Sequence, residues 1–431
     1  MPAYSEMTTD QLRALEQQLA AEYDVAKHKG IKLNMARGKP APAQLDLSLP
    51  LLDEINSHSD LFASDGTDCR NYGVLAGIPE ARAFFADILG IKPENVIVGG
   101  NASLAVMHDA LDRAYTHGVL GSTPWCKLDK VRWLCPVPGY DRHFTLVQHY
   151  GFEMISIPMT GEGPDMDLVE KLVAEDPAIK GIWCVPQYSN PTGETYSEET
   201  VRRLASMKTA ADDFRIFWDN AYIVHHLYED PEMQGHIPEM LSVCAEAGNP
   251  DRVYEFTSTS KVTLPGAGIS CMAASEANVA DTLRLMGAHT IGYDKINQLR
   301  HVRFLKDAQG TLNHMMKHAA ILRPKFKLVD EVLERELGET GVATWTKPLG
   351  GYFVSFNAMP GTAKEIGELT KAAGLTLTTV GATYPGGVDP QDSNIRIAPS
   401  YPTLEELAGC MDLFVLCVKL ASVRCILASR A

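Results

Sequence analysis

The sequence predicts an α/β protein with a large domain, built on a mostly parallel sheet between helices, and a smaller α+β domain. From about residue 70 onward, short apolar runs alternate with segments of helical periodicity, which is typical of βαβ units. Near residue 340 the pattern changes to "ATWTKPLGGYFVSFNAM" and later "SNIRIAPS", which indicates a second domain. With 431 residues, 45% of them hydrophobic, the chain is long enough for roughly two or three domains with a pocket between them.

The first predicted element is an N-terminal helix. Thr8 and Gln11 have the spacing of a capping box, apolar residues between Leu12 and Tyr23 recur at helical spacing, and Gly30 is expected to end the helix. The next segment, "KLNMARGKPAP", is rich in glycine, proline and basic residues and predicts a loop.

Six apolar runs predict the strands of the large sheet: "NVIVGG", "KVRWLCPVPGY", "FEMISIPM", "IKGIWCVPQ", "FRIFWDNAY" and "RVYEFTSTSK". Helical patterns separate these runs, so most of the strands are expected to be parallel and covered on both faces. A long helix is expected from Gln298 to Leu337, with a kink at Pro324. Ligands of such sheets gather at the carboxyl ends of the strands, so the residues that follow the runs are candidates for a functional site.

Composition narrows the possible partners. The net charge of −15 argues against a nucleic-acid surface. The N-terminus lacks the features of a signal peptide, and no apolar stretch reaches the ~18 residues of a membrane span. Nine scattered cysteines without a CxxC pair suggest neither a disulfide framework nor a metal site. We therefore expect a cytoplasmic protein with reduced thiols, no bound metal, and no nucleic-acid or membrane partner.

The first candidate site follows the run "NVIVGG". Gly99 and Gly100 permit a tight turn, and Asn101, Ala102 and Ser103 open the next helix. Free backbone N–H groups and the dipole of that helix favour a phosphate. Glycine at a strand-to-helix turn is also common without any ligand, so a plain turn remains the alternative.

Two further candidates follow later strands. Asn190 precedes a proline, which favours an extended backbone and leaves its amide free to hydrogen-bond into a cleft. Asp219 ends a hydrophobic strand, where a carboxylate needs a cation such as a protonated ring nitrogen, and Tyr222 could offer its phenol to the same ligand. The structural alternatives are an Asn-Pro turn for Asn190 and a helix N-cap for Asp219.

The fourth candidate is Lys261, flanked by Ser258 and Ser260 in "EFTSTSKVTLPGAGIS". A lysine amine with a lowered pKa is nucleophilic and can form a Schiff base, and the two hydroxyls suit a phosphate. A lysine that merely reaches from a strand end to solvent is the alternative. Asn190, Asp219 and Lys261 follow three successive strands, 29 and then 42 residues apart.

Taken together, "SNPTG", "DNAY" and "STSK" resemble the motifs of the fold-type I pyridoxal-phosphate aminotransferases of class I/II. "MARGKP" and "NIRIAPS" extend the resemblance over nearly the whole chain. It implies the PLP-dependent transferase fold, with a seven-stranded, mostly parallel sheet in the large domain. We expect residues 1–55 to join the small domain, 56–315 to form the large cofactor-binding domain, and 316–431 to form the small domain.

The resemblance implies that pyridoxal 5'-phosphate is the cofactor and assigns a role to each residue at its ring. Lys261 would hold the cofactor covalently and later move the proton of the substrate α-carbon. Asp219 would pair with the ring nitrogen, and Asn190 and Tyr222 would hydrogen-bond the ring oxygen. Tyr140 would stack on the ring, although a tyrosine of the core is an equally good interpretation of that residue alone.

The residues implied at the phosphate are Asn101, Ala102, Ser103, Ser258 and Ser260. Tyr72 matches a tyrosine that reaches the phosphate from the neighbouring subunit, which implies a homodimer with shared active sites. Many members of the family carry a phosphate-binding arginine eight residues after the lysine. This chain has Ile269 there, so the resemblance leaves the phosphate without its usual cation.

For the substrate, Arg396 matches the arginine that binds the α-carboxylate, with a surface ion pair as the alternative. Gly38 lies in the loop that closes over the substrate, and Asn190 also lines its site. Arg37, Lys39 and Arg300 are candidates to bind a second, side-chain carboxylate. A planar guanidinium suits the first role because it can grip a carboxylate with two parallel hydrogen bonds.

The resemblance implies transamination between an amino acid and a 2-oxo acid by a ping-pong mechanism. The "SKVTLPGAGIS" and "MARGKPAP" forms look most like a divergent bacterial subgroup of aspartate aminotransferases, which convert L-aspartate and 2-oxoglutarate to oxaloacetate and L-glutamate. The alternatives are an aminotransferase for aromatic, alanine or kynurenine donors, a β-lyase, and, more distantly, a non-catalytic regulator that binds the cofactor.

Overall fold

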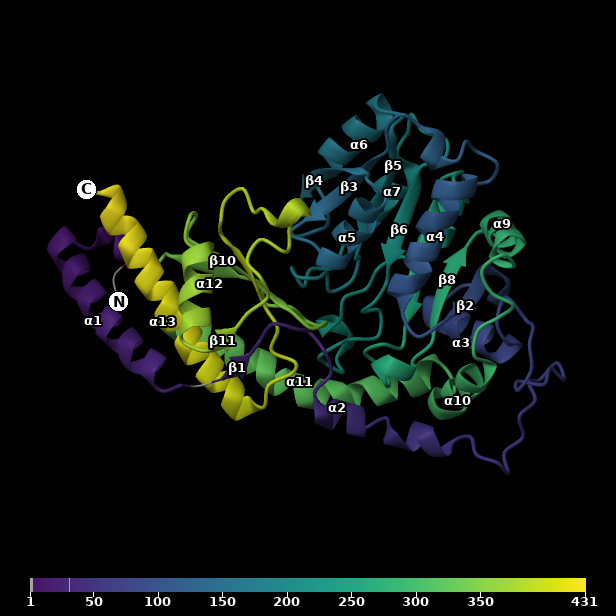
Figure 1. Ribbon diagram of the computed structural model, residues 1–431, viewed down its shortest axis with the longest axis horizontal. Coiled ribbons are helices and arrows are strands. Elements are labelled where there is room, and N and C mark those ends of the chain that lie inside the picture. Colours follow the sequence, from purple (N-terminus) through teal and green to yellow (C-terminus); the bar gives the residue numbers. More distant parts are fainter. Residues whose placement is uncertain (1–2, 31) are drawn as a thin grey trace.

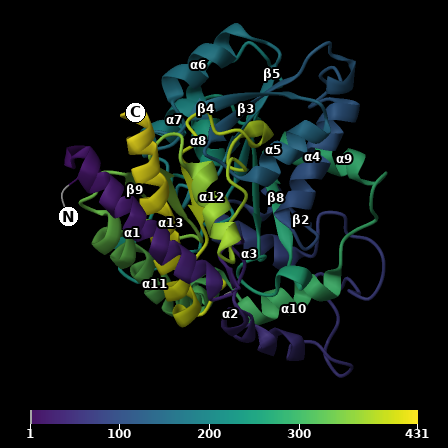
Figure 2. The same cartoon turned by 60° about the vertical axis from the view of Figure 1, so that its left-hand side comes forward.

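Two lobes, each built around its own sheet, make up the chain (Figure 1). The computed structural model describes residues 3–30 and 32–431. Figure 2, turned by 60°, shows that α1 (Thr9–His28) lies along α13 (Leu404–Ser429), so the two ends of the chain cover the same side of the C-terminal lobe.

The large lobe contains a seven-stranded sheet with the order β2-β8-β7-β6-β5-β3-β4. The two pairs that include β8 are antiparallel and the other four are parallel, which confirms the predicted mostly parallel sheet. Most of these strands are buried along their whole length, which explains why they are continuous apolar runs in the sequence. The strands are β2 (Val96–Gly99), β3 (Arg132–Val137), β4 (Glu153–Pro158), β5 (Ile179–Cys184), β6 (Arg215–Asp219), β7 (Val253–Ser258) and β8 (Ser270–Ala274).

Helices cover both faces of this sheet (Figure 1). Successive residues of β6 show the division, because Phe217 belongs to the core under α4 and α5, and Trp218 belongs to the core under α6, α7 and α8. A third core joins α3 and α10 to β2 and β8. The helices are α3 (Pro79–Leu89), α4 (Ser103–His117), α5 (Asp141–His149), α6 (Met166–Glu175), α7 (Glu198–Ser206), α8 (Met240–Glu246), α9 (Glu276–Met286) and α10 (Lys295–Leu305).

The C-terminal lobe has an antiparallel sheet with the order β12-β10-β9. Its strands are β9 (Ala343–Trp345), β10 (Val354–Ala358) and β12 (Asn394–Ile397), and its helices include α12 (Ala363–Ala372) and α13. The N-terminal segment belongs to this lobe in part, because β1 (Leu33–Asn34) pairs in parallel with β11 (Leu375–Thr376). After β1 the chain continues through α2 (Pro42–Asp46).

The helix α11 (Ala308–Leu337) links the two lobes along their lower side (Figure 1). Met315 packs in a core of the large lobe, whereas Leu322 and Phe326 pack in the core of the C-terminal lobe. This helix runs across the predicted boundary at residue 315, and the domain boundaries stay a prediction. Short 3-10 helices occur at Tyr4–Glu6, Leu49–Asp53, Pro93–Asn95, Trp125–Lys127, Pro231–Met233, Pro265–Ala267 and Pro385–Gly387.

Two predictions about helices can be compared with the structure. The capping box of α1 is confirmed, since Gln11 N donates to Thr8 Oγ1 (3.3 Å) and Thr8 N donates to Gln11 Oε1 (2.8 Å). The single helix expected from residue 298 to 337 is wrong, because the chain breaks between α10 and α11. Lys306 has a φ of 71°, and Asp307 caps α11 by accepting from the Gly310 N–H (2.7 Å), while α11 continues through Pro324.

Some features matter for location and chemistry. Within residues 3–30 and 32–431, no helix is long and apolar enough to cross a membrane. In the same part of the chain, no group of three His, Cys, Asp or Glu side chains is arranged to hold a metal ion, and the nine cysteines are free thiols. The cytoplasmic location stays a prediction.

Candidate active site

The candidate residues on neighbouring strands lie at one edge of the large sheet. Asp219 is the last residue of β6, Asn190 lies six residues after β5, and Lys261 lies three residues after β7. These three strands are adjacent and parallel, so their carboxyl ends meet at the same edge. The sheet therefore places the three side chains on the rim that faces the C-terminal lobe (Figure 1).

Asp219 has one carboxylate oxygen in use and one free. Its Oδ2 accepts a hydrogen bond from His143 Nε2 (2.9 Å), and the imidazole stacks on the indole of Trp183 with ring centroids 4.2 Å apart. Its Oδ1 is buried and has no hydrogen-bond partner among the described residues. No helix of the described chain begins at Asp219, so the N-cap alternative is not observed. A buried, half-satisfied carboxylate suits a protonated ring nitrogen.

Lys261 lies beside Tyr222, with Nζ 4.8 Å from the centroid of the phenol ring. Burial and the negative charge of Asp219 raise the pKa of Tyr222, so its hydroxyl stays protonated and can donate a hydrogen bond at neutral pH. Burial likewise raises the pKa of Tyr140 to about 12, against the opposing charge of Lys261. Tyr140 caps α5 and its ring meets the edge of His143, at a centroid distance of 5.0 Å. These aromatic groups surround the lysine and the carboxylate.

The predicted phosphate residues also lie together. Ser258 Oγ donates to Ser260 Oγ (2.9 Å), and Ser260 Oγ donates to the backbone oxygen of Asn101 (3.2 Å). Ala102 is the N-cap residue of α4, and Ser103 is its first residue. Among the described residues no side chain caps this helix, so its first backbone N–H groups remain available to an anion next to the serine hydroxyls.

Ile269 stands where many members of the family have a phosphate-binding arginine, and it supplies no positive charge to this region. Its side chain is buried in the core that contains Val262 and Leu299. The nearby Arg300 holds the adjacent turn instead: its Nε donates to Asn297 Oδ1 (2.6 Å), and its Nη2 lies 3.4 Å from the backbone oxygen of Ala267.

Arg396 reaches the same cleft from β12 of the C-terminal lobe. Its Nη1 donates to Asn190 Oδ1 (3.1 Å) and to Asp141 Oδ1 (3.2 Å), and its guanidinium lies over the ring of Phe353 at 4.8 Å. The side chain is 8% exposed, so the alternative of an ordinary surface ion pair does not describe it. Gly38 packs against the other part of this ring, since a Cβ at that position would come within 2.3 Å of Phe353 Cζ.

Other predicted residues lie outside this cluster. Tyr72 is 84% exposed on a loop and, within the described chain, makes no hydrogen bond or ring contact with the residues above. Lys39 Nζ sits over the ring of Tyr401 at 4.0 Å. Arg37 is exposed in the same loop.

Sequence reasoning missed four residues of the cleft: Asp141, His143, Trp183 and Phe353. His143 could have been found, because it lies three residues after Tyr140 at the start of an expected helix, where both side chains share a face. Asp141 is next to Tyr140, but its partner Arg396 is 255 residues away. No pattern in the sequence indicates the contact of Phe353 with Gly38.

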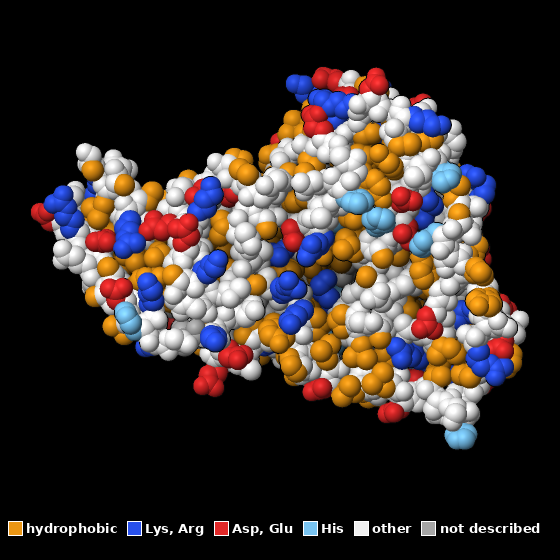
Figure 3. Space-filling model, viewed as in Figure 1, with side chains coloured by type: hydrophobic (Ala, Val, Ile, Leu, Met, Phe, Trp, Pro, Cys, Tyr) orange, Lys and Arg blue, Asp and Glu red, His pale blue; other side chains and the backbone are white. Residues whose placement is uncertain are grey.

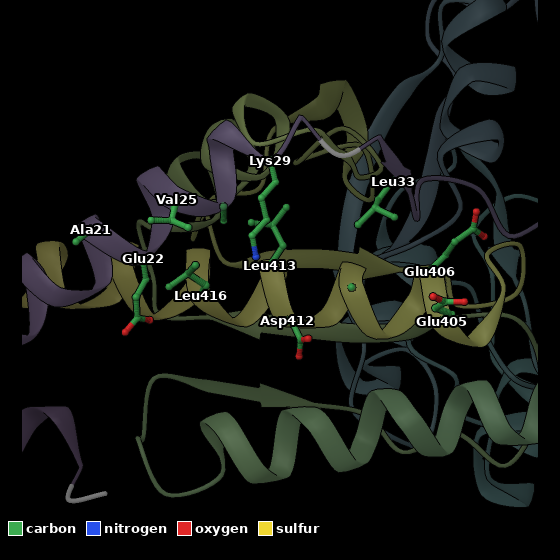
Figure 4. A pocket seen from close by; sticks show the side chains of 12 residues that line it. Ala21, Glu22, Val25, Lys29, Leu33, Glu405, Glu406, Asp412, Leu413 and Leu416 are labelled. Carbon is green, nitrogen blue, oxygen red and sulfur yellow. The ribbon is translucent and has the colours of Figure 1, made fainter.

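Charge supports the cleft as the ligand site. Basic side chains gather in the hollow between the lobes (Figure 3). A separate groove of 810 Å³ lies between α1 and α13, with an apolar floor that includes Leu413 and Leu416 (Figure 4). Its rim carries Glu22, Glu405 and Asp412, so its charge disfavours phosphate and carboxylate ligands.

Comparison with known proteins agrees with this geometry. The family model described as aspartate amino-transferase matches residues 7–430. The chain belongs to this family. The predicted resemblance to fold-type I pyridoxal-phosphate aminotransferases is thereby confirmed.

Individual relatives extend the comparison. The aspartate aminotransferase of Corynebacterium glutamicum is 46% identical over 417 residues, which cover 96% of this chain and 95% of the relative. A crystal structure of an aspartate transaminase from the same species superposes with a TM-score of 0.95 at 45% identity, covering 98% of this chain and 99% of that one.

A more distant structure shares the fold alone. The α-aminoadipate aminotransferase LysN of Thermus thermophilus, complexed with N-(5'-phosphopyridoxyl)-L-leucine, has a TM-score of 0.71 at 20% identity and covers 94% of this chain and 95% of that one. The predicted α/β fold with a large and a small domain is confirmed by the superposition on the aspartate transaminase of Corynebacterium glutamicum.

Proposed function

We propose that this protein transfers the amino group of L-aspartate to 2-oxoglutarate, forming oxaloacetate and L-glutamate, with pyridoxal 5'-phosphate as cofactor. The observation that carries the proposal is the buried Asp219 Oδ1, which has no partner in the described part of the chain, in one cleft with Lys261 and Arg396. That combination offers a cation acceptor, an amine nucleophile and a carboxylate clamp. The choice of aspartate is supported by the 46% identical aspartate aminotransferase of Corynebacterium glutamicum.

The residues present fit the cofactor. When bound, pyridoxal phosphate acts as an electron sink for negative charge on the substrate α-carbon. Asp219 would keep the ring nitrogen protonated, and Tyr222 would donate to the ring oxygen. Asn190 uses its Oδ1 to accept from Arg396, which keeps its NH2 group as a second donor for that oxygen. Tyr140 would cover the face of the ring.

At the phosphate, the proposed contacts are hydroxyl and backbone N–H groups. Ser103 would supply a hydroxyl, Ser258 and Ser260 would supply theirs after turning from their present acceptors, and Asn101 and Ala102, just before α4, would supply N–H groups. Tyr72 would come from a second subunit, so the active enzyme would be a homodimer. The high exposure of Tyr72 in the single chain supports this role.

Lys261 would act on the proton. Once its amine is released by the incoming amino acid, it is a base beside the substrate α-carbon, and it would carry the proton from that carbon to the cofactor. Arg396 would hold the α-carboxylate, and the loop around Gly38 would cover the substrate. The amino group then passes to the second oxo acid in a separate half-reaction, so ping-pong kinetics are expected.

The test is a steady-state assay with 2-oxoglutarate and a scan of amino donors, on wild type, Lys261→Ala and the control Lys327→Ala. Lys327 is an exposed residue of α11, so its loss should change nothing. Aspartate as best donor, with activity and the visible absorption of the lysine-bound cofactor lost only in Lys261→Ala, supports the proposal. If another amino acid is the best donor, the assignment of aspartate as substrate is wrong, and the assignment as an aminotransferase stands. Normal turnover by Lys261→Ala removes the assigned role of the lysine.

A further inference from the structure

The guanidinium proposed to hold the substrate carboxylate already holds a carboxylate of the protein. Asp141 Oδ1 lies 3.2 Å from Arg396 Nη1. The same Nη1 also donates to Asn190 Oδ1, while Arg396 Nε has only a long contact of 3.4 Å with Thr378 Oγ1. One nitrogen of the guanidinium, Nη1, is therefore already held by an anion before any substrate arrives.

The pair crosses the cleft. Asp141 is the first residue of α5 in the large lobe, whereas Arg396 belongs to β12 in the C-terminal lobe. Arg396 is 8% exposed, but Asp141 is 30% exposed, so the aspartate approaches the clamp from the solvent side. A buried structural ion pair would have both partners enclosed, and this one does not.

Asp141 also has a second cation within reach. Its Oδ2 lies 3.9 Å from Nε of Arg142, whose side chain is 54% exposed on the same turn of α5. The carboxylate thus stands between two guanidinium groups, one in the cleft and one at the surface. Rotation of a single short side chain could exchange the first partner for the second.

We infer that Asp141 sets the affinity of the site for carboxylates: it competes with the substrate carboxylate for Arg396 and pairs with Arg142 when substrate binds. The inference rests on the proposed role of Arg396 as the carboxylate clamp. A substrate carboxylate needs the planar edge of the guanidinium for two parallel hydrogen bonds, and Asp141 holds part of it. Ligands that cannot make both bonds, such as chloride, do not displace it as readily.

The competition lowers the affinity for every carboxylate ligand by the strength of the Asp141–Arg396 pair. Such pairs are weak when fully exposed and stronger when one partner is buried. For this half-buried pair, we expect Asp141→Asn to bind carboxylates about three- to tenfold more tightly than wild type. The substitution preserves size and leaves the start of α5 intact.

The first experiment measures dissociation constants of unreactive carboxylates by calorimetry on the cofactor-loaded enzyme. Maleate serves as a dicarboxylate and propionate as a monocarboxylate. The variants are Asp141→Asn, Asp141→Glu, and Asp167→Asn as a control that removes one charge from an exposed residue of α6. Tighter binding of both ligands by Asp141→Asn, with Asp141→Glu and Asp167→Asn near wild type, is expected. Equal or weaker binding by Asp141→Asn overturns the inference.

The second experiment tests the role of Arg142 with a double-mutant cycle. Arg142→Gln deprives the displaced aspartate of its second partner, so both ligands should bind more weakly in the wild-type background. In the Asp141→Asn background the same substitution should have no effect. If Arg142→Gln still weakens maleate there, Arg142 binds the ligand itself, and its assigned role as receiver of Asp141 is wrong.

A third variant separates this inference from the proposed function. Arg396→Lys should lose most of the binding of both ligands, because an ammonium cannot make the paired contact. If Arg396→Lys binds as well as wild type, Arg396 is not the clamp and the proposed function fails at that residue. If Arg396→Lys binds both ligands more weakly but Asp141→Asn does not bind them more tightly, only the role assigned to Asp141 is wrong.

Discussion

The two walls of the cleft are built in different ways. On the large lobe, Asn190, Asp219 and Lys261 each follow a strand by a few residues, and adjacent parallel strands bring them together. On the C-terminal lobe, Arg396 packs on Phe353, the residue before β10, and Gly38 of the N-terminal segment packs against the same ring. One wall follows from a polar residue placed after each of three adjacent strands, and the other also needs contacts with the large lobe and with the N-terminal segment.

The difference predicts a division of labour. The large lobe presents buried groups with fixed partners, such as Asp219 with His143, which suits chemistry that depends on a defined protonation state. The C-terminal lobe presents Arg396 with shared and partly exposed partners, which suits binding and release. Substitutions of Asp219 or Lys261 should therefore change the rate of turnover, and substitutions of Arg396 or of residues in contact with it, such as Asp141 and Phe353, should change affinity.

The largest effect is expected for Asp219→Asn on the first wall. An amide has nearly the same shape but cannot hold a ring nitrogen in its protonated form, so kcat should fall by about 10²- to 10⁴-fold. The measurement is steady-state transamination with the cofactor saturating. As a control, Asp213→Asn changes another buried aspartate, which pairs with Lys180 at the opposite, amino end of the same strands. A kcat within a factor of a few of wild type would contradict the proposed role.

Arg396→Lys should produce the next effect, and mainly in KM. Lysine keeps the positive charge and loses the planar pair of donors, so kcat/KM for amino and oxo acids should fall by about 10- to 100-fold with a smaller change in kcat. Separate determination of kcat and KM checks this split. If Arg396→Lys lowers kcat and leaves KM unchanged, Arg396 serves turnover rather than affinity, and the two walls do not differ in this way.

The two walls also differ in how much of them could be predicted from the sequence. Asp219 and Lys261 were predictable because a polar residue at the end of an apolar strand is visible in a short window, and the sheet rule supplies their proximity. The contact of Asp141 with Arg396 spans 255 residues, and no local pattern encodes it. The break before α11 was missed for a related reason, because the helical periodicity continues through Lys306 and Asp307 while the backbone there does not.

Buried titratable groups differ between the regions as well, which gives a prediction for stability. Burial raises the pKa of Glu255, in β7 of the large sheet, to about 8, whereas burial lowers the pKa of His318, in α11, to about 3. Between pH 4.5 and about 8, Glu255 stays protonated in the folded protein, whereas in the unfolded chain it is ionised. Glu255 therefore stabilises the fold less and less as pH rises from about 4.5 to about 8.

His318 acts in the opposite sense. Its unfolded form takes up a proton below pH 6.5 and the folded form does not, so its contribution is lost as pH falls from 6.5 toward 3. Denaturant unfolding of Glu255→Gln from pH 5 to 8 should show a slope of stability against pH that differs from wild type by up to about 1.4 kcal/mol per pH unit. Equal slopes for the two proteins would show that Glu255 is ionised in the folded state.

The smallest effect is expected at the contact that joins the N-terminal loop to the second wall. A Cβ on Gly38 would lie 2.3 Å from Phe353 Cζ, closer than atoms can approach, and the backbone of Gly38 is not in the left-handed region. Gly38→Ala therefore leaves the chain conformation accessible but forces the ring or the loop to move. Because the ring supports Arg396, KM should rise by about three- to tenfold, with kcat nearly unchanged.

Steady-state kinetics of three variants isolate the cause of this change. Gly287→Ala is the matched control, since Gly287 ends α9 with nothing within 4 Å of the added carbon. Combining Gly38→Ala with Phe353→Leu makes room for the new carbon. If the double variant shows no higher KM than Phe353→Leu alone, the steric contact is the cause. If Gly38→Ala lowers kcat and leaves KM unchanged, the loop serves turnover rather than affinity, and the second wall does not act by binding alone.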